Sequence, residues 1–372
     1  MDNFHNNTNV STNISSYENN EDNEDNEDND HDTNDNASIT NTNGSFSNII
    51  KKMNTDENDF PDNISKSPYS DINIKTQSPY EIDNTINTNA NVNENIKFKS
   101  KLVLSGGGIK GIAHIGALYA LEQINCLSSI TEFSGTSVGS LIIALHVIGY
   151  TASELYDFIK LFNLGKLKDI SIVNIQLFGL DTGSRVEYVI KRLINGKNLN
   201  ENITLKELYE KTSKKIIFVT VCLNNMEVCY VSHETFPELP LYLAIRMSIS
   251  IPLIYCPVIY QDKMYIDGGC LDNYPISIFK DNITETIGII LFDAKDNVEK
   301  IDNFETYIFR VLDCMIRGMM LNLKNGYDQH TIEIHVESIN IANYEIDNIK
   351  KDELFIKGYK AVMNNIEKLK IN

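Results

Sequence analysis

The sequence predicts an α/β fold of three layers, in which a mostly parallel central sheet has helices on both faces and follows a disordered amino-terminal tail. Three observations predict this fold. Short apolar runs alternate with helix-like segments from Lys101 onward. Two of these runs end in glycine-rich turns that lead into helices. The first 100 residues, in contrast, are polar, rich in asparagine and strongly acidic.

The tail differs from the rest of the chain in charge and composition. The whole chain of 372 residues has a formal net charge of −18. Its first 100 residues hold 19 acidic and 6 basic side chains, which leaves −13, together with 25 asparagines. Such a segment buries too little apolar surface to offset the conformational entropy that it loses on folding. We therefore expect residues 1–96 to be disordered and residues 97–372 to form one domain.

The elements of the domain follow from its apolar runs and turn signals. Strands are expected at residues 102–104, 130–134, 215–223, 227–232, 286–292 and 331–337. Helices are expected at residues 109–124, 138–149, 151–162, 303–323 and 352–369. The segment 138–149 is almost wholly apolar, which indicates a helix at the centre of the domain. Strands that alternate with helices favour a parallel sheet covered on both sides.

Composition also excludes several classes of protein. An acidic chain without a basic stripe is not expected to bind nucleic acid, because contacts to phosphate supply most of that affinity. No apolar run approaches the length of a membrane-spanning helix, and the amino terminus lacks the cationic and apolar regions of a signal peptide. The six cysteines form no C-x-x-C pair, which favours free thiols in a reducing compartment. We expect a cytoplasmic protein that can contact membrane surfaces.

The first glycine-rich turn follows the strand at 102–104 and consists of Gly106-Gly107-Gly108-Ile109-Lys110-Gly111. Glycines at this place let backbone N–H groups approach a ligand closely, and the N-terminus of the following helix adds a partial positive charge. The string also fits the G-x-G-x-x-G pattern of dinucleotide-binding turns. A nucleotide-binding module that catalyses no hydrolysis therefore remains an alternative.

The second turn, Gly135-Thr136-Ser137-Val138-Gly139, is a G-x-S-x-G string between a strand and a helix. Such a turn presents the serine hydroxyl at the end of the strand, so Ser137 is a candidate nucleophile. A serine that only caps the following helix would occupy the same position. Residues 112–134, 23 in number, separate the two turns and suffice for one helix and one strand. The turns then belong to one β-α-β unit and lie at the same sheet edge, where glycine amides can stabilise an oxyanion.

A serine nucleophile needs a base within hydrogen-bonding reach. Asp267 is the stronger candidate, because an apolar strand leads it to the double glycine Gly268-Gly269; an aspartate that merely caps this turn is the alternative. His330 and His335 also follow Ser137 in the chain, so an α/β-hydrolase-type esterase with a Ser-His-Asp triad stays open. If Asp267 is the base, we expect burial to raise its pKa, since an exposed carboxylate with a pKa of about 4 is a poor base at neutral pH.

The glycine-rich turn, the G-x-S-x-G string and the D-G-G string resemble, in this order, the motifs of the patatin-like phospholipases. The segment 244–257 (A-I-R-M-S-I-S-I-P-L-I-Y-C-P) and the D-N-Y-P of Asp272–Pro275 also match that family. The resemblance covers roughly residues 101–276 and implies a patatin-like fold. Three motifs in the same order, with fitting intervals, are far more specific than any one of them.

The resemblance implies a hydrolase that cleaves carboxylic esters of phospholipids or lysophospholipids with a Ser-Asp dyad, through an acyl-enzyme and without metal or cofactor. By position, Ser137 is the nucleophile and Asp267 the base. The oxyanion and the substrate are then bound by Gly106, Gly107, Gly108 and Ile109. The supporting motif positions are Lys110, Gly111, Gly135, Gly139, Gly268 and Gly269. The implied partners are an acyl-lipid substrate and a membrane surface, with no nucleic acid.

Overall fold

The computed structural model describes residues 43–55, 97–293, 300–301, 304–323, 325–336 and 346–371. The strands of its central sheet are β1 Lys101–Leu104, β2 Glu132–Thr136, β4 Lys215–Cys222, β5 Glu227–Val231, β7 Val258–Tyr260, β8 Lys263–Asp267, β9 Thr286–Asp293 and β10 Thr331–Val336. Their order is β10-β9-β1-β2-β4-β8-β7, with β5 paired to β4. The pairs from β10 to β4 are parallel, whereas β8, β7 and β5 join in antiparallel pairs. Two further strands, β3 Gly179–Asp181 and β6 Leu253–Tyr255, form a small parallel sheet.

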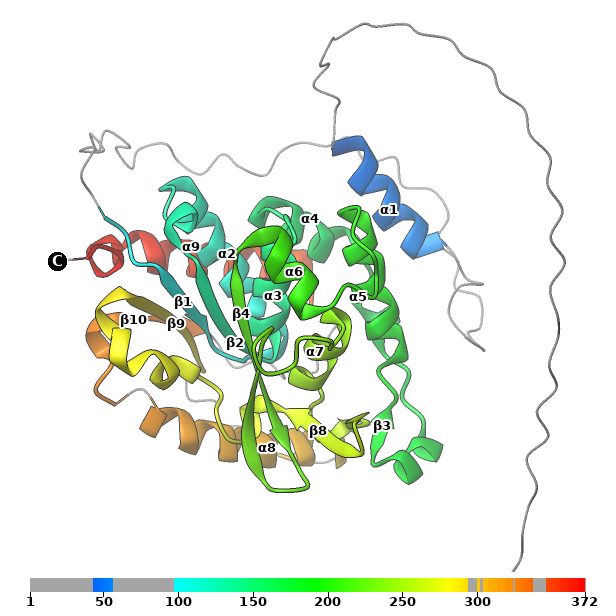
Figure 1. Ribbon diagram of the computed structural model, residues 1–372. Helices are drawn as coiled ribbons and strands as arrows, with labels where there is room; N and C mark the ends of the chain where they lie inside the picture. Colours follow the sequence, from blue (N-terminus) through cyan, green and yellow to red (C-terminus); the bar gives the residue numbers. More distant parts are fainter. Residues whose placement is uncertain are drawn as a thin grey trace, which may run out of the picture. The chain divides into compact units, whose positions relative to one another are not determined.

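Helices fill the connections between these strands (Figure 1). The α-helices in the described ranges are α1 Asn43–Thr55, α2 Ile112–Gln123, α3 Val138–Val147, α4 Ala152–Leu161, α5 Ser184–Gly196, α6 Leu205–Thr212, α7 Leu241–Ser248, α8 Phe304–Leu323 and α9 Asn348–Met363. The 3₁₀ helices are η1 Gly108–Gly111, η2 Leu127–Ser129, η3 Leu164–Leu167, η4 Ile172–Leu177, η5 Gly268–Cys270, η6 Pro275–Glu285, η7 Asp328–His330 and η8 Ile366–Leu369. Among the helices described, none combines the length and hydrophobicity that crossing a bilayer requires.

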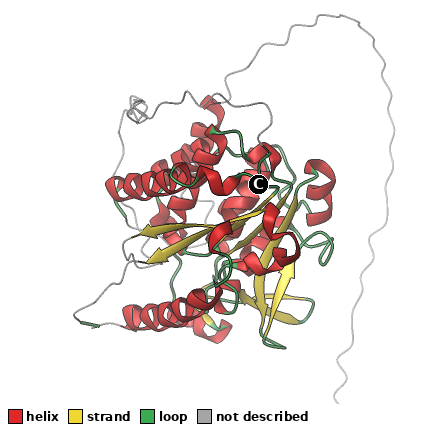
Figure 2. Ribbon diagram, turned by 90° about the vertical axis from the view of Figure 1, so that its left-hand side faces the viewer, coloured by secondary structure: helices red, strands yellow, loops and turns green. Residues whose placement is uncertain are grey.

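Both faces of the central sheet are covered, as alternating side chains on its strands show. On β1, Leu102 and Leu104 belong to the main core, whereas Val103 points to the opposite face. There Val103 joins a smaller apolar cluster with Phe279 of η6 and Met320 of α8. Figure 2 shows the strands between the larger group of helices and the long helix α8. The predicted three-layer fold with a mostly parallel sheet is confirmed.

One prediction about the tail is wrong. Residues 1–96 were expected to be disordered throughout, yet residues 43–55 form α1, which packs against α4 and α5. Ile50 and Met53 of α1 are buried, and the side-chain amide of Asn54 donates a hydrogen bond to the carbonyl oxygen of Leu161 at 3.0 Å. A short segment can bury an apolar stripe even when the composition around it is strongly polar. The rest of the predicted tail lies outside the described residues.

Helices α2 and α9 cross so closely that each places a glycine against the other's backbone. A Cβ atom on Gly116 would lie 1.9 Å from the carbonyl oxygen of Phe355. A Cβ atom on Gly358 would lie 1.8 Å from the carbonyl oxygen of Ala113. Neither contact is possible for a real side chain, so these two glycines determine how closely α9 packs against α2.

We expect Gly116→Ala to destabilise the protein by about 2–3 kcal/mol, because overpacking a close contact forces backbone to move. Gly318→Ala on α8 is the matched control, since no described atom lies within 4 Å of the added methyl group. Alanine should there be neutral or stabilising by up to about 1 kcal/mol. Urea unfolding measures both effects, and equal midpoints for the two variants would contradict the close crossing.

Candidate active site

Ser137 occupies the turn between β2 and α3 in a backbone conformation that non-glycine residues seldom adopt. Its φ is 53° and its ψ is −124°, a combination that costs conformational energy. The residue is 6% exposed, and its side chain forms no capping hydrogen bond with α3. The alternative of a serine that serves only as a helix cap is therefore wrong.

Hydrogen bonds from neighbouring elements hold this turn. The N–H of Ser137 donates to Oγ of Ser248 at 3.0 Å, and that hydroxyl donates to the carbonyl oxygen of Val219 at 2.7 Å. Oγ of Ser140 lies 2.8 Å from Oγ of Ser248 and donates to the carbonyl oxygen of Gly135 at 2.6 Å. Ser140 and Ser248 were not among the predicted site residues, because a lone serine in a helix has no distinctive spacing.

The supporting glycines lie where a side chain would not fit. A Cβ atom would come within 3.0 Å of a neighbouring atom at Gly111, Gly135, Gly139, Gly268 and Gly269. At Gly139 the nearest atom is the carbonyl oxygen of Leu104, at 2.6 Å, and at Gly268 it is that of Val219, at 2.4 Å. These glycines therefore allow the two turns to lie directly against β1 and β4.

The register of the sheet brings Asp267 toward Ser137. Thr136, the last residue of β2, pairs with Val219 of β4, and the next residue of β4, Thr220, pairs with Asp267 of β8. Ser137 and Asp267 thus lie on the two sides of one strand, two strand spacings or about 10 Å apart in the backbone. Both line the same cavity, so their side chains face a common space.

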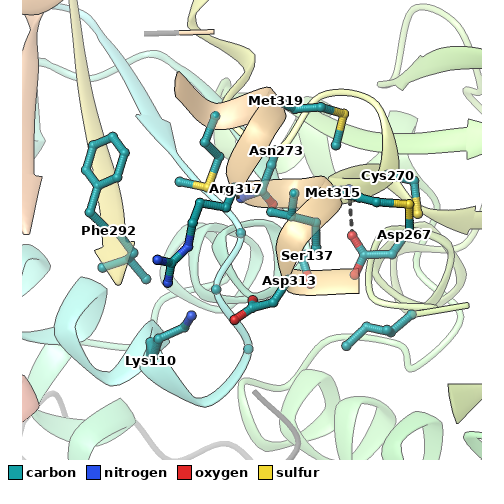
Figure 3. A pocket seen from close by; sticks show the side chains of 18 of the residues that line it. Lys110, Ser137, Asp267, Cys270, Asn273, Phe292, Asp313, Met315, Arg317 and Met319 are labelled. Carbon is teal, nitrogen blue, oxygen red and sulfur yellow. Dashed lines mark hydrogen bonds between the residues drawn. The ribbon is translucent and has the colours of Figure 1, made fainter. Parts of the chain in front are cut away.

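Burial raises the pKa of Asp267 from 3.8 to about 6. Only 5% of the residue is exposed, and removal from water disfavours the charged carboxylate. Hydrogen bonds from the Ser137 side chain and from the N–H of Gly269, which donates to Oδ1 at 2.7 Å (Figure 3), oppose this increase in pKa. The expectation of a raised pKa is confirmed.

The glycine-rich turn differs in one respect from the expectation. The N–H of Gly106 donates to the carbonyl oxygen of Asn273 at 3.0 Å, so it is not available to an oxyanion. Within the described part of the chain, no acceptor is found for the N–H groups of Gly107, Gly108 and Ile109. Gly108 has a φ of +55°, which glycine adopts without strain. The available amides therefore begin at Gly107 and not at Gly106.

Two cavities meet at Ser137. The first has a volume of about 200 Å³ and lies between the glycine-rich turn, Asp267 and the inner side of α8. The second has a volume of about 160 Å³, and its walls are almost entirely apolar side chains from α2, α3, α4 and α5. Gly108, Ser137 and Ile251 line both cavities. No residue of α8 was predicted to belong to the site, because nothing in the local sequence pattern of this helix shows what it covers.

Charged side chains are confined to the first cavity. Lys110 from the glycine-rich turn and Asp313 and Arg317 from α8 line it, and Figure 3 shows the three pointing toward one another. Lys110 is buried. With Asp267, two cations and two carboxylates line the first cavity, whereas no charged side chain of the described residues lines the second.

No histidine of the described residues lines the first cavity. His330 lies in η7 before β10, at the opposite end of the parallel strands from Ser137, and its Nδ1 is 2.9 Å from Nζ of Lys99. His335 is on β10, three strands from β2. His114 donates to the carbonyl oxygen of Ser105, and burial lowers its pKa to about 4. The arrangement does not support the alternative of a Ser-His-Asp triad.

A serine on a strained strand-to-helix turn, beside a buried carboxylate and a glycine-rich turn with available amides, is typical of hydrolases that attack esters. A model of the patatin-like phospholipase family matches residues 102–280. The chain is 32% identical over 282 residues to an uncharacterized protein of Acanthamoeba polyphaga mimivirus, over 72% of this chain and 94% of that protein. The chain therefore belongs to the patatin-like phospholipase family of lipid hydrolases.

Two other relatives have functional names. The chain is 34% identical over 189 residues to a protein of Invertebrate iridescent virus 6 named probable lipid hydrolase, over 49% of this chain and 63% of that protein. It is 28% identical over 179 residues to the lysophospholipase NTE1 of Scheffersomyces stipitis, over 48% of this chain and 11% of that protein. The second match covers only a small part of a much longer relative.

The raised pKa of Asp267 makes folding less favourable as pH rises from about 4 to about 6, because the unfolded state then loses its proton first. We expect Asp267→Asn to be more stable than the natural protein by on the order of 1–3 kcal/mol above pH 6, with this difference vanishing near pH 4. Urea unfolding over a pH series measures it.

Asp281→Asn, at an exposed position, is the control and should change stability little at any pH. A stability difference for Asp267→Asn that stays constant across the pH range would contradict the burial of a charged carboxylate at this position.

Proposed function

We propose that this protein is a lipid acyl hydrolase that cleaves carboxylic ester bonds of phospholipids or lysophospholipids with a dyad of Ser137 and Asp267. One observation carries the proposal. Ser137 has the strained backbone of a nucleophile turn and lines the same cavity as Asp267, whose pKa burial raises to about 6. A carboxylate with this pKa is charged at neutral pH and still accepts a proton more readily than an exposed one.

In the first step, Oγ of Ser137 attacks the ester carbonyl while Asp267 accepts the hydroxyl proton. The carbonyl oxygen becomes an oxyanion, which the available amides of Gly107, Gly108 and Ile109 can bind. The bond to the alcohol then breaks, and the leaving oxygen takes the proton from Asp267. Water next attacks the acyl-enzyme and gives one proton to the same carboxylate. The bond between the acyl carbon and Oγ of Ser137 then breaks, and Oγ takes that proton back from Asp267, which releases the fatty acid and restores Ser137.

The two cavities support a substrate with one apolar and one anionic part. The apolar cavity suits the acyl chain, because hydrocarbon gains free energy in proportion to the area removed from water. The first cavity, with Lys110 and Arg317, suits a phosphate-bearing head group. Since Ser137 lies where the cavities meet, the ester carbonyl would be placed between chain and head group. The names of the family and of the lysophospholipase relative agree with such a substrate.

We also propose that the protein acts in the cytoplasm at membrane surfaces, without metal or cofactor and without binding nucleic acid. The acidic charge of the chain and the chemistry of the site support these points. A nucleotide-binding role without hydrolysis is disfavoured, because the glycine-rich turn lines one cavity together with Ser137 and the carboxylate of Asp267. Binding of a nucleotide gives no reason for either side chain at this place.

A fluorophosphonate probe tests the nucleophile directly. We expect the natural protein to be labelled, Ser137→Ala to lose all labelling, and hydrolysis of a phosphatidylcholine substrate to fall at least about a thousandfold in Ser137→Ala and Asp267→Asn. The variant with both His330→Ala and His335→Ala is the control and should keep its activity. Labelling that persists in Ser137→Ala, or activity that disappears in the histidine variant, would show that the dyad is wrong.

The pH dependence tests the base. Because Asp267 must be deprotonated to accept the serine proton, kcat/KM should rise with pH along a limb centred near its pKa of about 6 and then level off. Steady-state hydrolysis of a soluble short-chain ester measures this profile. A limb centred at the pKa of an ordinary aspartate, about 4, would refute Asp267 as a buried general base.

A further inference from the structure

An apolar projection formed by residues 170–178 stands out from the domain between η3 and β3. It includes η4, and its six large apolar residues are between 53% and 78% exposed: Ile170, Ile172, Val173, Ile175, Leu177 and Phe178. No residue from 170 to 178 is charged. Single exposed apolar residues are normal on a protein surface, but six within nine positions are not.

The base of the apolar projection is firmly held. The carboxylate of Asp181 accepts hydrogen bonds from the N–H groups of Asp169 at 2.6 Å and Gly183 at 2.7 Å. Arg185 forms an ion pair with Asp169 at 3.0 Å and donates to the carbonyl oxygen of Lys168 at 2.6 Å. Asp181 and Arg185 are both buried. Since the two ends of the projection are anchored in this way, its apolar side chains are held outward.

Strained backbone at the carboxyl-terminal end of the projection also indicates a functional role. Phe178 has a φ of 66° and Leu253, on the neighbouring strand β6, has a φ of 68°. Gly179 pairs with Leu253, so the two strained residues are close together. Bulky residues rarely adopt the left-handed region, and here both are more than half exposed and gain no burial in return. Backbone strain of this kind is typically found where it holds side chains in position for binding or catalysis.

The apolar projection adjoins the site. Leu164 and Leu167 of η3, which is separated from the projection by two residues, line the apolar cavity, as do Ile251 and Tyr255 on either side of Leu253. The exposed residues therefore continue from the rim of the cavity that reaches Ser137. Because the exposed residues lie next to the apolar cavity, we expect that whatever binds them also enters this cavity. A lipid of the bilayer can do so, whereas a folded protein cannot.

Other elements contribute exposed apolar residues to the same side of the domain. On α8, Tyr307, Val311 and Met315 recur at intervals of four and are exposed, and Met315 also lines the first cavity. Met226 in the turn between β4 and β5 is 79% exposed. In Figure 1, α8, this turn and the segment before β3 all reach the lower side of the domain.

We propose that the apolar projection inserts into the lipid bilayer and holds the entrance of the apolar cavity at the membrane surface. The occupant is the hydrocarbon boundary of the bilayer, and this choice rests on the proposed function. Short apolar elements insert to the level of the acyl chains, and their contribution grows with the apolar area that they bury there. A lipid acyl chain can then pass from the bilayer to Ser137 without crossing water.

The chain contains no tryptophan, so a single introduced tryptophan reports on its own surroundings. We expect Val173→Trp to show a blue-shifted emission when phosphatidylcholine vesicles are added. Ile349→Trp on α9, at a position with similar exposure in the natural protein (72% against 70%), should show no shift. Equal emission changes in the two variants, or no change in Val173→Trp, would overturn the proposal.

Sedimentation with the same vesicles measures the contribution of the apolar projection, in a Ser137→Ala background so that binding does not depend on turnover. The double variant Ile172→Ser, Val173→Ser should bind vesicles at least about tenfold more weakly, because binding scales with buried apolar area. Ile349→Ser is the control. With Ser137 present, the double variant should lose hydrolysis of vesicle lipid and keep hydrolysis of a soluble short-chain ester.

The remaining outcomes contradict either the membrane proposal or the proposed function. Unchanged vesicle binding with an unchanged melting temperature would overturn the membrane proposal and leave the hydrolase proposal standing. Loss of a concentration-dependent dimer in sedimentation velocity, with vesicle binding unchanged, would assign the projection to a contact between two copies. Absence of soluble-ester hydrolysis in the natural protein would instead contradict the proposed function.

Discussion

The site depends on the parallel pairing of β1, β2 and β4 in one register. Leu104 pairs with Gly135 and Thr136 pairs with Val219, so these strands end at a common edge. The glycine-rich turn and the serine turn therefore leave the sheet side by side. The antiparallel strand β8 then returns Asp267 to the same edge through its pair with Thr220. A slip of one residue in any of these pairs would turn a buried side chain outward and separate the groups.

The same arrangement lowers the stability of the folded state while it favours the proposed reaction. The turn at Ser137 is strained, and the carboxylate of Asp267 is buried with no cation beside it among the groups that act on its pKa. Each feature is unfavourable for folding and useful for attack on an ester. The surrounding structure compensates through the hydrogen bond that the N–H of Ser137 donates to Ser248, the one that the N–H of Gly269 donates to Asp267, and close packing at glycines. The opposing effects are concentrated in a few residues at the sheet edge.

The sequence was sufficient to predict the parallel strands and the two turns, because apolar runs bounded by glycine leave few local alternatives. The strand β7 and the helices α5, α6 and α7 were not among the predicted elements. The sequence was insufficient where the role of a residue depends on a contact with a residue far away in the chain. The amide of Gly106 is used by Asn273, far along the chain, and no local pattern reports this bond. The position of α8 over the cavity could not be predicted for the same reason, since it depends on contacts with distant parts of the chain. Helix α1 was missed for another reason: an average over 100 polar residues conceals an apolar stripe formed by Ile50 and Met53.

The contact between α2 and α9 also bears on how the chain reaches this structure. Helix α9 begins at Asn348, well beyond the residues 102–280 that match the family model, and β1 takes its second partner from β9, which begins at Thr286. A fragment that ends at 280 would leave β1 with an unpaired edge and α2 with an uncovered face. During synthesis, the motif-bearing part of the chain therefore exposes apolar surface until β9 and α9 have been made. Chaperones can bind the nascent chain during that interval.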